Sequence, residues 1–123
     1  MTILEAITRI DAIKPNNYSN IDKAKWLSII DATIKKEIID THEGGKEFDF
    51  KGYDEFTPQE TTLIAPAPYD DLYIKWLECQ IDYTNAEYKK YNNSVTSFNT
   101  AYSAFERYYN RQYMPKSQKL KFF

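Results

Sequence analysis

Apolar and aromatic side chains recur at helical spacing through the second half of the chain. From Ile74 to Tyr109 they follow steps of three, four or seven, and only Thr84 fills a slot with a less apolar side chain. Steps of three and four keep side chains on one face of an α-helix, whereas a strand requires steps of two. Residues 68–111 are therefore predicted to form one aromatic-faced helix, or two helices that share one phase. The stripe consists of Ile74, Leu77, Ile81, Tyr88, Tyr91, Val95, Phe98, Tyr102, Phe105 and Tyr109.

The ends of this stretch carry helix signals, and its middle carries a weak point. Pro68 suits the first helical position, with the acids Asp70 and Asp71 in the first turn. The run Asn92–Ser94 contains poor helix formers that are good caps, so a split there is one alternative. The unbroken phase favours a continuous helix with a bend at this run. We expect Met114-Pro115 to end it.

The first 43 residues predict two shorter helices. Residues 2–13 have isoleucines at helical spacing, and Lys14-Pro15 followed by two Asn ends this first helix. Ser19 or Asn20 is a good N-cap for a second helix over about 21–41. Gly44-Gly45 should end that helix. Its apolar set is Ala24, Leu27, Ile29 or Ile30, Ile34 and Ile38, with Trp26 on the flank.

The region from residue 44 to residue 67 has no helical pattern. Phe48 and Phe50 alternate with charged residues, and Thr61–Ile64 is a second β-prone run. This favours either a short β-hairpin or an irregular loop that its aromatic side chains hold in place. Ala65–Pro68 should form an extended, stiff lead-in to the long helix.

Together these elements predict a mainly α fold. We expect a small helical bundle with a long C-terminal aromatic-faced helix and an irregular or hairpin insertion at 44–67. A length of 123 residues suits one domain, which we place at 1–113, followed by a flexible basic tail at 114–123.

Charge is distributed unevenly, although the net charge is only −2. The segment 40–60 contains seven acids against two lysines, whereas 111–123 contains four bases and no acid. An acidic middle and a basic end suggest different contacts. One cysteine excludes an intramolecular disulfide and fits a reducing compartment. With no apolar run of membrane-spanning length and no signal-peptide pattern, we expect a soluble cytoplasmic protein and no membrane partner.

The sequence offers little catalytic chemistry. Three glycines, at 44, 45 and 52, cannot form a phosphate-binding loop, so no nucleotide cofactor is expected. His42 and Cys79 are the only residues of their types and have no ligand spacing; we expect a solvated histidine at a helix end and a buried or half-buried cysteine. Asp71, Glu78 and Asp82 could ligate a metal only if another helix supplied partners, so no metal site is predicted.

The tyrosine-rich stripe could also stack on nucleic-acid bases. Stacking surfaces usually interleave aromatic residues with Arg and Lys. Here the aromatic positions alternate with Asn, Ser, Thr and acids, which favours a core or a subunit interface.

Several short motifs lie along the chain, and they include Lys14–Asn16, Trp26–Leu27, Glu37–Ile39, Tyr69–Tyr73, Trp76–Leu77, Gln80–Tyr83, Tyr91–Ser94 and Tyr108–Arg111. Together they resemble one family of structural proteins from tailed bacteriophages and prophages, the head–tail connector proteins, also called adaptor or head-completion proteins. The resemblance covers about residues 5–115.

This resemblance implies a non-enzymatic, mainly helical subunit of the virion, assembled in the host bacterial cytoplasm. Connector subunits form a dodecameric ring below the portal, extend the DNA channel and bind the next connector or a tail-completion protein. DNA is then only cargo of the channel. The isolated chain could be a monomer before assembly. The C-terminal segment of such proteins commonly reaches into the portal, which makes Lys116, Lys119, Lys121, Phe122 and Phe123 the portal-docking candidates.

Three aromatic residues lie off the main stripe and are candidates for a subunit interface: Tyr73, Trp76 and Tyr83. A ring needs two different complementary faces on each subunit. An alternative function is a small regulatory or DNA-binding helical module. It would bind DNA through Arg107, Arg111, Lys116, Lys119 and Lys121.

Overall fold

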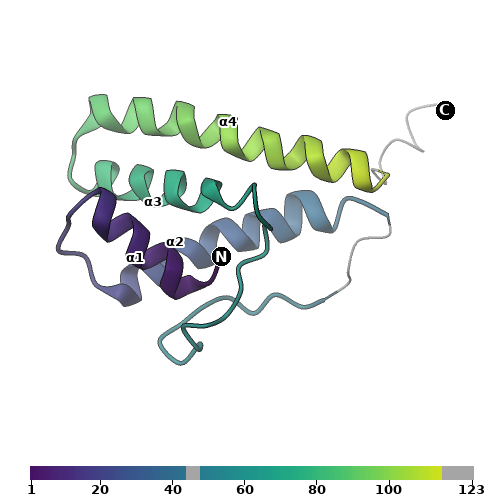
Figure 1. Cartoon of the computed structure of the whole chain (residues 1–123), viewed down its shortest axis with the longest axis horizontal. Coiled ribbons are helices and arrows are strands. Elements are labelled where there is room, and N and C mark those ends of the chain that lie inside the picture. Colours follow the sequence, from purple (N-terminus) through teal and green to yellow (C-terminus); the bar gives the residue numbers. More distant parts are fainter. Residues whose placement is uncertain (44–47, 115–123) are drawn as a thin grey trace.

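The structure is a computed structural model, and it describes residues 1–43 and 48–114. These residues are mainly helical and form no strand, so the predicted α class is confirmed and the hairpin alternative is not seen. In chain order the elements are α1 (Ile3–Ile13), α2 (Asn20–Ile34), the π-helical turn η1 (Lys35–Ile39), α3 (Asp71–Thr84) and α4 (Tyr88–Gln112). Residues 48–70 form a long irregular connection that leads into α3 (Figure 1).

Both N-terminal helices begin at side-chain caps. Thr2 and Glu5 form a capping box at α1, which confirms the first predicted helix. The Ser19 hydroxyl accepts the Asp22 N–H at 3.1 Å, so Ser19 is the N-cap of α2. The sequence pattern allowed either Ile29 or Ile30 as the core residue. Ile30 is 2% exposed and Ile29 is 53% exposed, so Ile30 is the core residue. The helical run ends with η1 at Ile39, so it stops before Thr41 and before the predicted end at Gly44-Gly45, which lies outside the described residues.

The predicted long helix is broken, and the prediction of continuity is wrong. The chain leaves α3 after Thr84 and enters α4 at Tyr88, with Ala86 at a φ of 58° between them. The alternative split at Asn92–Ser94 is also wrong, because these residues lie within α4. There the Ser94 hydroxyl donates a 2.6 Å hydrogen bond to the Asp82 carboxylate of α3. This tertiary contact stabilises the helix where the local propensity is poor.

The start of α3 also differs from the prediction. Pro68 is not in the first helical turn, because α3 begins at Asp71 with Asp70 at the N-cap position. Pro68 instead lies in a turn in which the Tyr69 N–H donates to the Pro66 carbonyl at 2.8 Å. The Ala67–Pro68 peptide bond is cis. Residues 67–70 form a turn, so the extended lead-in that the prolines suggested is not present.

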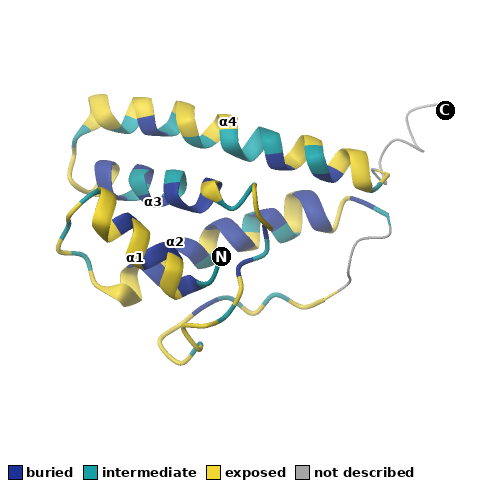
Figure 2. Ribbon diagram, in the orientation of Figure 1, coloured by how far each residue is buried: buried dark blue, intermediate teal, exposed yellow. Residues whose placement is uncertain are grey.

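The helix α3 is the centre of the bundle. It lies between α4 on one side and the pair α1 and α2 on the other, and α3 and α4 run antiparallel side by side (Figure 1). Its buried residues are Leu72, Tyr73, Ile74, Leu77, Cys79, Ile81 and Asp82. In α4 only Ser94, Phe105 and Tyr109 are buried, so this helix presents a long exposed face (Figure 2). The continuous stripe in the sequence thus corresponds to two facing helices.

The connection between η1 and α3 is attached to the start of α1. The N–H groups of Ile3 and Leu4 donate to the carbonyls of Thr61 and Gln59, both at 3.0 Å. The first N–H groups of a helix have no partner within the helix, so the connection satisfies two of them. No helix in the described part of the chain is both long and apolar enough to cross a membrane.

Candidate functional site

A buried carboxylate holds the irregular connection against the helices. Asp31 of α2 is fully buried and accepts hydrogen bonds from the hydroxyls of Tyr53 and Tyr73, both at 2.5 Å. The N–H of Ile64 donates to the same carboxylate at 3.1 Å. The Tyr73 hydroxyl in turn accepts the Ala65 N–H at 2.7 Å. One acid therefore joins α2, α3 and the connection.

Burial dominates the electrostatics of this network. It raises the pKa of Asp31, because the cost of removing the carboxylate from water exceeds the gain from its three donors. Burial and the adjacent Asp31 also raise the pKa of the Tyr53 and Tyr73 hydroxyls well above the usual tyrosine value. Both tyrosines thus stay protonated and act as donors.

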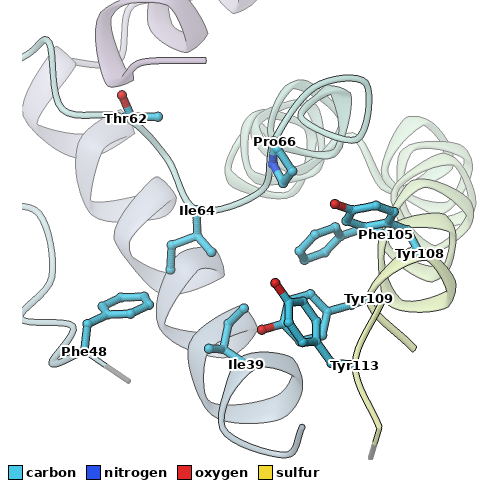
Figure 3. A pocket seen from close by; sticks show the side chains of 9 residues that line it. All are labelled: Ile39, Phe48, Thr62, Ile64, Pro66, Phe105, Tyr108, Tyr109 and Tyr113. Atoms are coloured by element: carbon cyan, nitrogen blue, oxygen red, sulfur yellow. The ribbon is translucent and has the colours of Figure 1, made fainter. Parts of the chain in front are cut away.

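The anchored connection forms one wall of an open pocket. Its volume is about 500 Å³, which is within the ~300–1,000 Å³ typical of small-ligand sites. Side chains from η1, from the connection and from the end of α4 point toward this hollow (Figure 3). The lining residues, called here the aromatic pocket, are Ile39, Phe48, Thr62, Ile64, Pro66, Phe105, Tyr108, Tyr109 and Tyr113.

The π-helical turn places Ile39 in this pocket. The Asp40 N–H donates to the Lys35 carbonyl at 2.9 Å, five residues back. The wider turn lets two consecutive residues, Ile38 and Ile39, both face inward, with exposed fractions of 0% and 7%. π-Helical turns are rare and occur frequently at functional sites. Lys35 also lies over the ring of Phe48, with its ammonium 4.9 Å from the ring centre.

Stacked and tilted rings form the opposite wall. Tyr108 stacks on Tyr69 with ring centres 4.6 Å apart, and Tyr109 tilts against Tyr113 at the same distance. The Tyr109 ring meets His42 edge to face at 4.9 Å. Burial raises the pKa of Tyr109, so its hydroxyl is neutral. Among the described residues, no charged side chain lines the pocket, which therefore suits an apolar or aromatic group.

His42 is buried, which corrects the prediction of a solvated histidine. It is 6% exposed, its Nδ1 donates to the Ile38 carbonyl at 2.6 Å, and its Nε2 lies 2.5 Å from the side-chain amide oxygen of Asn110. One residue on, the Glu43 N–H donates to the Met114 carbonyl at 2.8 Å. These contacts hold the end of α4 to the end of η1 and so shape the pocket.

The three predicted interface residues differ in how far they are exposed in the structure. Tyr73 is fully buried inside the chain as a donor to Asp31, so it has no surface to offer a neighbouring subunit and this candidate is wrong. Trp76 is half-buried, and its indole N–H donates to the Trp26 carbonyl at 2.7 Å. Tyr83 is 59% exposed and stays a candidate.

Tyr83 belongs to an exposed aromatic cluster at the α3–α4 turn. Its ring centre lies 6.2 Å from that of Tyr88 and 5.3 Å from that of Tyr91. Tyr88 is 58% exposed. We call Tyr83, Tyr88 and Tyr91 the tyrosine tip. The tip lies at the turn between α3 and α4, whereas the aromatic pocket is lined by residues from the C-terminal end of α4, so the two lie at opposite ends of this antiparallel helix pair.

The predicted portal-docking residues Lys116, Lys119, Lys121, Phe122 and Phe123 lie outside the described residues. The two arginines proposed for DNA binding are described. Arg107 and Arg111 are both exposed on α4 and are four residues apart, so they share one face.

The carboxylates of α3 do not converge on a metal site. Asp82 is buried and pairs with Lys14 at 2.5 Å, in addition to its bond from Ser94. Among residues 1–43 and 48–114, no group of three potential ligands is close enough to hold an ion. Cys79 is 2% exposed, which confirms the buried alternative, and burial next to Asp82 and Glu78 raises the pKa of its thiol to about 11.

Two parts of this site were not predicted from the sequence. Asp31 follows Leu27 by four residues and precedes Ile34 by three, so an acid occupies an apolar slot of the α2 stripe, and this was the available signal. The aromatic pocket combines residues from three separate regions and had no local signal.

No protein-family model, no curated protein and no solved structure matches the chain.

Proposed function

We propose that the chain is a head–tail connector, or adaptor, subunit of a tailed bacteriophage or prophage. In this role it is a non-enzymatic structural protein. Copies of it form a dodecameric ring that joins the portal to the tail and extends the DNA channel. Its partners are the portal protein, the next connector or tail-completion protein and other copies of itself. It acts in the virion after assembly in the host cytoplasm.

The motifs behind the family resemblance support this proposal by their positions. Lys14 pairs with Asp82, and the Trp76 indole donates to the Trp26 carbonyl. Tyr69 stacks on Tyr108. Motifs that are far apart in the sequence therefore meet across the bundle, as expected if they specify one shared fold.

The observation that carries the proposal is the presence of two different aromatic surfaces at opposite ends of the α3–α4 hairpin. The tyrosine tip is exposed at one end, and the aromatic pocket is open at the other. A ring is a heterologous assembly, so each subunit must present two unlike surfaces to its neighbours or partners. A monomeric enzyme or a simple two-fold dimer has no such requirement.

Binding to the portal tests the assignment. The full chain and a chain that ends at Tyr113 would each be mixed with the portal protein encoded in the same gene neighbourhood, and the complexes examined by electron microscopy and native mass spectrometry. We expect rings on the portal with the full chain and none with the shorter one. If the shorter chain joins portal-bearing, DNA-filled heads normally, the role of the tail is refuted; if the full chain never binds a portal, the function itself is refuted.

A pair of variants tests the role of the tyrosine tip. Tyr83→Ala together with Tyr88→Ala removes two exposed rings and should reduce ring formation on the portal. Phe56→Ala is the matched control, because Phe56 is 84% exposed and belongs to neither surface. Equal ring formation by both variants would show that the tip is not a subunit contact.

The exposed pair Arg107 and Arg111 favours one alternative, a DNA-binding module. Phosphate contacts through these arginines and the basic tail would give binding that weakens steeply with salt. A gel-shift experiment at low salt tests this alternative, and the absence of a shifted band would eliminate it.

A further inference from the structure

The aromatic pocket opens where the described chain ends. Tyr113 lines the pocket, and the carbonyl of the next residue, Met114, accepts the Glu43 N–H. Nine residues follow Met114, since the sequence has 123 residues. Nine residues span at most about 30 Å, which is ample for a segment that begins at the rim of the pocket to turn back into it.

The sequence of that segment complements the lining of the pocket. Leu120 and Phe122 are two residues apart, so in an extended segment they share one side, whereas Lys119 and Lys121 share the other. Phe123 adds a second aromatic ring at the end. The lining consists mainly of aliphatic and aromatic side chains, with Thr62 as the one lining residue that is neither, which suits such an apolar side.

Charge near the pocket fits the basic side of the segment. Asp49 is exposed and directly follows the lining residue Phe48, whereas Asp40, which follows Ile39, already forms an ion pair with Lys35. The segment 115–123 contains three lysines and no acidic side chain. Attraction between Asp49 and these lysines would help to orient the apolar side of the segment toward the pocket.

We propose that the aromatic pocket is the docking site of the chain's own C-terminal segment, with Phe122 and Phe123 as the rings that enter it. The short tether favours this occupant, because it keeps the segment near the pocket at an effective concentration on the order of millimolar. A free apolar ligand or the segment of a second copy has no such advantage. The proposal concerns the isolated chain and holds whether or not the chain is a connector subunit.

Isoleucine methyl signals in NMR spectra provide the test. Ile39 and Ile64 line the pocket, whereas Ile7 and Ile10 are buried in α1 and serve as internal controls for the fold. When the chain is shortened to end at Met114, the methyl signals of Ile39 and Ile64 should move because nearby aromatic rings are lost. The signals of Ile7 and Ile10 should stay in place.

A synthetic peptide of residues 115–123 completes the experiment. Added to the shortened chain, it should return the Ile39 and Ile64 signals saturably toward their positions in the full chain. A peptide with Phe122→Ser and Phe123→Ser should bind at least about tenfold more weakly, because two buried rings are lost.

Two results would overturn the proposal. The first is that shortening the chain leaves the Ile39 and Ile64 signals unchanged, which would mean that the segment does not occupy the pocket. The second is that these signals in the full chain depend on protein concentration together with a rise in particle size, which would assign the pocket to the segment of a second copy. Neither result involves the portal, so the proposal fails or stands separately from the connector function.

Discussion

The segment Leu63–Pro66 separates two regions of the molecule with opposite properties. Leu63 and Ala65 are buried, and the backbone of Ile64 and Ala65 belongs to the hydrogen-bond network around Asp31. The side chains of Ile64 and Pro66 line the aromatic pocket. The Asp31 network is closed and polar, and the pocket is open and apolar.

Because of this difference, we expect the Asp31 network to contribute to the stability of the fold and the pocket to contribute to binding. No buried side-chain polar atom in the described part of the chain lacks a hydrogen-bond partner, so the Asp31 network has no vacancy for a ligand. The pocket has mainly apolar walls and a volume of about 500 Å³, which is within the range typical of small-ligand sites. Substitutions in the network should therefore change the free energy of unfolding, whereas substitutions at the pocket rim should change binding.

The largest loss of stability is expected when Asp31 is substituted. Asp31→Ala leaves two buried tyrosine hydroxyls and one N–H without their acceptor, and it should lower the free energy of unfolding by about 3–5 kcal/mol. Urea unfolding followed by circular dichroism measures this change. Asp22→Ala, at an exposed position of the same helix, is the control and should cost much less. Equal costs for the two variants would show that the network does not stabilise the fold.

A smaller loss is expected when one donor of the network is removed. Tyr73→Phe deprives both Asp31 and the Ala65 N–H of a partner and should cost about 1.5–3 kcal/mol. Tyr83→Phe removes an exposed hydroxyl and should change stability by less than about 0.5 kcal/mol. Equal losses of unfolding free energy for Tyr83→Phe and Tyr73→Phe would contradict this prediction.

The buried Asp31 should also make the free energy of unfolding depend on pH. Burial raises the pKa of Asp31 above its ordinary value of 3.8, so the folded chain holds its proton to a higher pH than the unfolded chain. The resulting stabilisation is fully present below the ordinary value and is lost as the pH rises through the folded-state pKa. The difference in unfolding free energy between the natural chain and Asp31→Asn should therefore fall as the pH rises from about 4 to about 7. A difference that grows over this range would mean that the pKa is lowered instead.

The smallest effect on stability is expected at the pocket rim. Phe48 lines the pocket but is 39% exposed, so Phe48→Ser should lower the free energy of unfolding by only about 0.5 kcal/mol. The same substitution should weaken binding of the peptide 115–123 to the shortened chain, as measured by methyl shifts. A loss of stability comparable to that of Asp31→Ala would show that the rim is part of the core.

The helices could be predicted because their signals are local. The start of α2 was predicted at Ser19 or Asn20, and its apolar spacing indicated most of the buried face, with only Ile29 or Ile30 left open. The break between α3 and α4 was missed because Ala86 adopts a positive φ that is usual for Gly or Asn. The two helices also continue the phase of the stripe. The less apolar Thr84, the last residue of α3, was the one local sign of the break.

The candidate site could not be predicted in the same way, because its parts meet only in the folded chain. Tyr73 lay off the stripe and suggested a subunit contact, but its hydroxyl has a buried acceptor on another helix. His42 followed a predicted helix end and suggested a solvated side chain, but the end of α4 covers it. Sequence spacing indicates which residues share a helix face, and it does not show which element covers that face.

The burial of Cys79 has a practical consequence for labelling. With a thiol pKa of about 11, only about one molecule in ten thousand carries the reactive thiolate at neutral pH, and the side chain is 2% exposed. Maleimide reagents should therefore leave the folded natural chain unmodified. A cysteine introduced at the exposed Phe56 would be the sole reactive thiol, so a fluorophore or spin label could be attached there without replacing Cys79.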